Sequence, residues 1–140
     1  GMKISVRYFR EQIPAGSDRP VRVEVKEGEK LNVGDRIYAE YDIWSLENRS
    51  YVQAVMPRHA CFRPADQLSG FIYGLYGYRE VKADRTLYWI DVFPEENSKI
   101  EETLFVTQEG VFSAPVAEIE SLYAPHYRAN DGSRGPVAVE

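Results

Sequence analysis

Alternation of apolar and polar residues with a period of two runs through most of this chain, and it constrains the fold more than any motif does. The segments 4–8, 21–25 and 37–43 each alternate in this way, so each predicts a half-buried strand. Segment 87–93 is apolar on both faces apart from Asp91, which indicates a central strand of a sheet. Further strands are expected at 100–106 and 111–112.

Turn-forming segments separate these strands, and no long amphipathic helix interrupts them. Short strands at this spacing predict an all-β fold, specifically an antiparallel β-sandwich. At most one short helix is expected, near 64–70, where Pro64 could occupy the first turn and Gly70 could follow the last. Segment 116–123 fits either a helix or a strand on its pattern alone.

The length of 140 residues corresponds to one domain. We expect a single domain over 2–127, preceded by Gly1, which is typical of the scar left by tag removal. The tail 128–140 is rich in turn-forming residues and poor in large apolar ones, so it is expected to be flexible.

Composition excludes several classes of protein. The net charge of −5 argues against a nucleic-acid-binding protein, which needs a basic face. No apolar run approaches the roughly 18 residues of a membrane span. A single cysteine excludes an internal disulfide framework.

Cys61 and His59 are the only pair that suggests nucleophilic catalysis. On an extended backbone, side chains two residues apart lie about 7 Å from each other, too far for a Cys–His hydrogen bond. We therefore interpret Cys61 as a small buried hydrophobe. A zinc site from these two residues and His126 would still lack a carboxylate, so no metal is expected.

The carboxylates also form no catalytic pattern. Glu118 and Glu120 share one face of a strand, whereas Glu101 and Glu102 face opposite ways. No spacing predicts a pair of acids across a cleft, and the common nucleophile, phosphate-binding and metal motifs are absent. The sequence therefore predicts neither an enzyme nor a bound cofactor.

Aromatic residues make up 13% of the chain and include ten tyrosines. The segment 71–78 (F-I-Y-G-L-Y-G-Y) places Tyr73, Tyr76 and Tyr78 around two glycines, which permit unusual backbone angles. Tyrosines in such a hairpin or loop suit an interface, but strands favour aromatic residues in a core as well. Both interpretations remain open on the pattern alone.

Six landmarks follow one another in an order that resembles a known family. They are V-R-Y-F (6–9), L-N-V-G-D-R-I (31–37), M-P-R-H-A-C-F-R-P (56–64), R-E-V-K-A-D-R (79–85), G-V-F-S-A-P (110–115) and S-L-Y-A-P (121–125). Together they resemble the C-terminal, receptor-binding-like macroglobulin domain of bacterial alpha-2-macroglobulin family proteins, over residues 3–127. Met56, His59, Cys61, Arg63 and Ala83 depart from the family pattern.

The resemblance implies a macroglobulin-like β-sandwich that is non-catalytic and belongs to a large protease-trapping protein, an endopeptidase inhibitor. It implies that this domain packs against the thioester domain of the parent chain and shields it, with proteases as indirect partners. It also implies an exported parent in the periplasm or cell envelope, and a strand over 116–123. Cys61 lacks a C-x-E-Q-like context, so it is not the thioester cysteine.

The resemblance and the aromatic segment together give a site hypothesis. The residues expected to face the neighbouring domain are Tyr73, Tyr76, Tyr78, Arg79 and Glu80. The alternative is a stand-alone carbohydrate- or protein-binding β-sandwich that uses exposed aromatics, such as Trp44 and Trp89, as stacking platforms. A thiol hydrolase acting through Cys61 is the third hypothesis.

Overall fold

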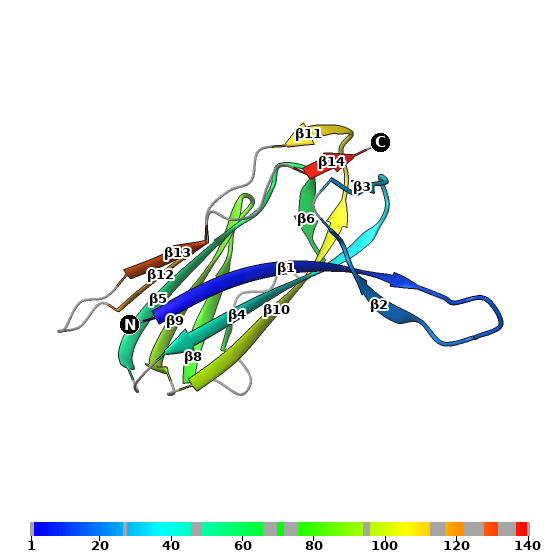
Figure 1. The fold of residues 1–140 in the computed structure, drawn as a ribbon. Helices are drawn as coiled ribbons and strands as arrows, with labels where there is room; N and C mark the ends of the chain where they lie inside the picture. The colour runs from blue at the N-terminus through cyan, green and yellow to red at the C-terminus, as the bar shows by residue number, and fades with distance from the viewer. Residues whose placement is uncertain are drawn as a thin grey trace.

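The computed structural model describes residues 2–26, 28–45, 49–65, 70–71, 76–93, 96–112, 117–121, 128–131 and 137–139. Within these ranges the protein forms strands and no helix (Figure 1). The described part accordingly holds no helix long and apolar enough to span a bilayer.

The strands form two larger sheets and one small one. The five-stranded sheet has the order β2 (Val21–Glu24), β1 (Met2–Gln12), β4 (Arg36–Ser45), β10 (Glu96–Val106), β6 (Phe62–Pro64). The six-stranded sheet has the order β13 (Arg128–Asp131), β12 (Ala117–Ser121), β5 (Arg49–Pro57), β9 (Arg85–Phe93), β8 (Tyr76–Val81), β7 (Gly70–Phe71). The small sheet has the order β11 (Gly110–Phe112), β14 (Val137–Val139), β3 (Lys30–Leu31).

Both larger sheets are antiparallel throughout, and among the described pairings only β14 and β3 run parallel. The predicted antiparallel β-sandwich is therefore confirmed. The expected central strand 87–93 is also confirmed, because β9 lies between β5 and β8.

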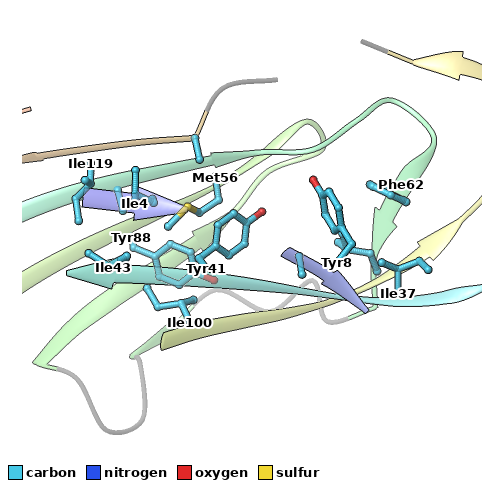
Figure 2. Close-up of a cluster of buried hydrophobic side chains, with 14 of the residues drawn as sticks. Ile4, Tyr8, Ile37, Tyr41, Ile43, Met56, Phe62, Tyr88, Ile100 and Ile119 are labelled. Atoms are coloured by element: carbon cyan, nitrogen blue, oxygen red, sulfur yellow. The ribbon is translucent and has the colours of Figure 1, made fainter. Parts of the chain in front are cut away.

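The core lies between the two larger sheets and consists of the inward-facing residues of their long strands. Figure 2 shows Tyr41 of β4 beside Tyr88 of β9 and Met56 of β5, with Ile43 and Ile100 nearby. All five are buried. Each such side chain contributes on the order of 1.5–3 kcal/mol through its removal from water, so the alternation in the sequence is what joins the two sheets.

The structure resolves the two segments whose pattern was ambiguous or helical. Segment 116–123 contains β12, which confirms the strand. At 64–70, Pro64 ends β6 and Gly70 begins β7, so both residues expected to bound a helix lie in strands. The interior of that segment, 66–69, is outside the described residues.

The tail 128–140, which is expected to be flexible, contains two short strands. It supplies β13, which pairs with β12, and β14, which lies between β11 and β3. Val139 is buried in the core cluster. A buried apolar residue thus lies in a segment whose composition is typical of a loop.

Strand β2 forms as predicted from segment 21–25, but it is not half-buried. Val21 and Val23 are exposed, and only Val25, just beyond β2, is buried. Figure 1 shows the reason: β2 and the end of β1 form a hairpin that projects beyond the second sheet. In the described part of the six-stranded sheet, no strand therefore covers them.

Candidate interaction surface

The outer face of the five-stranded sheet is a network of paired charges. Arg7 of β1 contacts Glu40 of β4 at 3.2 Å and Asp42 at 3.1 Å, and Lys99 of β10 contacts Glu40 at 3.1 Å. The hydrogen bond from Lys99 lowers the pKa of the Glu40 carboxyl. These charges are satisfied within the sheet, so this face offers few groups that need a partner.

The outer face of the six-stranded sheet has an apolar centre instead. Trp89 of β9 lies opposite Tyr78 of β8, and its neighbour on the same face, Leu87, lies opposite Val55 of β5. Trp89 is 38% exposed and Tyr78 is 42% exposed. Strand alternation assigns these residues to the outer face, because Tyr88 between Leu87 and Trp89 belongs to the core. We call Val55, Tyr78, Leu87 and Trp89 the aromatic face; Leu87 is buried within it, so Tyr78 and Trp89 supply most of its exposed surface.

Carboxylates border the aromatic face on two sides. Glu118 and Glu120 of β12 lie opposite β5 residues on one side, which confirms that they share a strand face. Glu80 of β8 lies on the other side, where it pairs with Lys82 at 3.5 Å. Large aromatic side chains inside a polar rim are the usual arrangement of a protein interface.

The predicted site residues fall into three groups. Tyr73 lies outside the described residues, and of Tyr76 the structure describes the backbone in β8 but not the side chain. Tyr78 and Glu80 lie on the aromatic face and its rim. Arg79 lies between them in β8 and points the other way, into the sandwich.

Arg79 lines a small cavity between the two sheets. The cavity of about 10 Å³ has room for roughly one water molecule. Its walls are Pro64, Arg79, Val81, Thr86, Glu102 and Thr103. Arg79 is thus placed to interact with the interior rather than with a docked domain.

Next to this cavity is a buried polar cluster that ties the two sheets together. Arg58, which follows β5, donates to the Thr86 hydroxyl at 2.7 Å and to the Arg85 carbonyl at 3.1 Å. Glu102, which β10 contributes from the opposite sheet, accepts from the Tyr88 hydroxyl at 2.8 Å and lies 3.9 Å from the Arg58 guanidinium. Burial raises the pKa values of Glu102 and Tyr88 and lowers that of Arg58.

The sequence reasoning missed this cluster, although a signal was present. Glu102 lies on the same face of β10 as Ile100 and Leu104, and both of these residues are buried. A carboxylate at an inward position of an apolar strand requires a buried partner. The prediction that Glu101 and Glu102 face opposite ways is confirmed, since Glu101 pairs with Arg22 on the outer surface.

Cys61 and His59 are both buried, and they are components of the core. Burial raises the pKa of the Cys61 thiol to about 11, which disfavours the nucleophilic thiolate. The His59 ring packs against Tyr8 and Phe62 and lies 3.3 Å from the Tyr8 hydroxyl. No group of three potential metal ligands occurs in the described part of the chain, and His126 is outside it.

The two tryptophans lie on opposite sides of the molecule. Trp44 is 37% exposed and lies on the outer face of the five-stranded sheet, under the Lys3 ammonium at 5.6 Å. Trp89 lies on the outer face of the other sheet. One ligand cannot stack on both, and among the described side chains the aromatic face provides two neighbouring exposed rings, Tyr78 and Trp89.

These features define a macroglobulin-like β-sandwich with an aromatic outer face. The chain matches the profile of the bacterial alpha-2-macroglobulin MG10 domain over residues 1–126. It therefore belongs to this family, which supports a non-catalytic domain of an alpha-2-macroglobulin-like protein. No curated protein sequence matches it.

Solved structures with the same fold come from bacterial alpha-2-macroglobulins. The Salmonella Y1175G mutant superposes with a TM-score of 0.74 at 18% identity, covering 99% of this chain and 9% of that one. The native Escherichia coli protein from domain MG7 to the C-terminus gives 0.75 at 14% identity, covering 99% and 23%. The E. coli protein activated by porcine elastase gives 0.76 at 15% identity, covering 99% and 13%. The chain thus spans under a quarter of each.

Proposed function

We propose that this chain is the non-catalytic C-terminal domain of a large, exported, protease-trapping protein of the periplasm or cell envelope. Its function is to pack against the thioester domain of the parent chain and to shield the thioester. The aromatic face carries this proposal, because it is the part of the described surface where large apolar side chains adjoin one another across strands.

A shield for a thioester has to exclude water from an acyl bond that water and amines attack. An apolar wall does this better than a network of paired charges, because ion pairs attract and order water. Two tyrosine- or tryptophan-sized side chains cover roughly 300–500 Å² together, enough to occlude one buried reactive group. The related solved proteins fit this chemistry: one is a Salmonella protein that has reacted with methylamine, and others are E. coli proteins activated by trypsin or elastase.

The test substitutes the aromatic face in the full-length parent and follows release of the thioester thiol with a chromogenic disulfide. Trp89→Ala and Tyr78→Ala are expected to accelerate thiol release about tenfold, the effect of losing one interface anchor of about 1.4 kcal/mol. Trp44→Ala is the matched control, because it removes an equally exposed tryptophan from the opposite sheet. Equal release rates in all three variants and the parent would contradict the proposal.

The remaining predicted site residues are tested in the same assay. Tyr76→Ala is expected to accelerate release if its ring extends the aromatic face. Arg79→Ala is expected to act mainly on stability, since Arg79 lines the inter-sheet cavity. Unfolding midpoints of each variant, measured on the 140-residue chain, separate these two effects.

The alternative is a stand-alone carbohydrate-binding module, and the adjacent rings of Trp89 and Tyr78 are the observation that favours it. Binding of a sugar there would quench or shift the tryptophan fluorescence of the unsubstituted 140-residue chain and of its Trp44→Ala variant, but not that of Trp89→Ala. Flat titrations across several polysaccharides would exclude this function.

A further inference from the structure

The hairpin formed by β1 and β2 is a projection that the described strands of the six-stranded sheet do not cover (Figure 1). We call residues 9–24 the arm. All side chains from 11 to 24 are exposed, yet the tip is a defined turn. The Ser17 amide donates to the Pro14 carbonyl at 3.0 Å, and Gly16 adopts the left-handed conformation that this turn requires.

One face of the arm is fixed to the outer face of the five-stranded sheet. The Arg22 guanidinium stacks 3.8 Å from the centre of the Tyr38 ring and pairs with Glu101. The Tyr38 hydroxyl donates to Glu11 at 2.8 Å. These contacts hold the arm in position, so a partner that binds it pays little conformational entropy.

The opposite face of the arm is open and mixed in character: Val21 and Val23 lie opposite Gln12 and Arg10, and Arg10 pairs with Glu29. Val21 and Val23 lie on the side that continues the core face, next to the buried Val25. Ile13, at the end of the arm, is 67% exposed. Three of the large exposed hydrophobic residues of the described chain are thus gathered on one projection.

The arm also presents unpaired backbone along its edge. Val25 donates its amide to the Tyr8 carbonyl. Because alternate residues of an antiparallel strand point their amides to opposite sides, the amides and carbonyls of Arg22 and Glu24 point away from β1. Strand β2 is the edge of its sheet, and no other described strand pairs with it on that side.

We propose that the arm pairs with an edge strand of another macroglobulin domain of the same parent chain. That strand supplies hydrogen bonds to Arg22 and Glu24 and places apolar side chains over Val21 and Val23. The proposal for the arm rests on the chain's membership of the family and does not depend on thioester shielding. The matched solved chains are several times longer than this domain, and one is described as starting at domain MG7, so further macroglobulin domains are present in such a chain. A partner that covered the two valines without providing a strand would leave buried backbone groups unsatisfied.

The test is residue-resolved hydrogen–deuterium exchange of the full-length parent compared with the 140-residue chain. The Arg22 and Glu24 amides are expected to exchange at least about tenfold more slowly in the parent, because a strand pairing protects them. The Val23 amide, which faces β1, serves as an internal control and should exchange alike in both. Val23→Lys in the parent is expected to abolish the added protection, whereas Val111→Lys, on a distant and highly exposed strand, should preserve it.

Equal exchange of Arg22 and Glu24 in the two proteins would overturn the proposal. Protection of these amides in the 140-residue chain itself, together with a dimer mass, would also overturn it by identifying a second copy as the partner. The outcome is independent of thiol release, so arm docking and thioester shielding can fail separately.

Discussion

Glu102 is a buried charged residue that connects the two sheets. It is a carboxylate at an inward position of β10, bound to Tyr88 and near Arg58 across the sandwich. Its desolvation is offset only while these partners are present. A buried ion pair of this kind makes the packing of the sheets specific at one end of the core.

We expect Glu102→Ala to lower the free energy of unfolding by about 3 kcal/mol, because it leaves the buried Arg58 charge without its carboxylate. The neighbouring Glu101→Ala breaks only an exposed pair with Arg22 and should cost at most about 1 kcal/mol. Urea unfolding of both variants measures the difference. Equal costs would show that Glu102 is not a structural link between the sheets.

Cys61 is expected to be unreactive toward thiol reagents in the folded protein and reactive after unfolding. Its pKa is raised from about 9 to about 11 by burial. The stability that the protonated thiol provides is therefore full below pH 9 and is lost as the pH rises toward 11. The unsubstituted chain and Cys61→Ala therefore differ in unfolding free energy by an amount that should decrease over this window, by on the order of 2 kcal/mol. Rapid labelling at neutral pH in the folded state would instead support the thiol hydrolase hypothesis.

At the scale of elements, β14 is a short strand that few residues keep in place. Strand β14 pairs with β11 on one side and β3 on the other, so it connects segments that are distant in sequence. Its buried Val139 lies beside Leu31 in this ladder. The end of the chain thus closes one side of the core.

Val139→Ala is expected to destabilise the protein by about 2 kcal/mol, through lost burial and the cavity that remains. Val111→Ala, in the adjacent strand but 75% exposed, should change stability by no more than about 0.5 kcal/mol. Thermal or denaturant unfolding of the pair decides this. Similar small effects would indicate that the tail packs loosely, as its composition suggests.

At the scale of the whole molecule, the two outer faces and the arm differ in chemistry, and we propose a different role for the aromatic face and for the arm. The charged face is self-paired, the aromatic face is proposed to cover the thioester domain, and the arm is proposed to pair with a further domain. Two proposed docking surfaces would let this one sandwich contact two other domains of the same long chain.

We expect an antiserum against this chain to detect a polypeptide well above 100 kDa in the envelope fraction of the source cells. The matched solved chains include ones of which this domain is about a tenth, which corresponds to roughly ten domains of ordinary size. A band near 16 kDa would show that the domain acts alone, and ligand screening of the aromatic face would follow.

The alternation in the sequence determined the strands and the sandwich, because a strand with one apolar face must bury that face against another layer. It also determined which side of each strand is buried, as Glu101 and Glu102 illustrate. The predicted neighbours Tyr78 and Glu80 share the outer face for the same reason, and Arg79 between them does not.

Only the tertiary structure decided how far burial extends along each strand. Val21 and Val23 alternate like core residues but project past the second sheet, whereas Val139, in a loop-like tail, reaches the core. The pairing of Trp89 with Tyr78 and of Glu102 with Arg58 likewise depends on strand order and register. These are long-range properties, and local patterns carry no information about them because each strand meets partners that are remote in the chain.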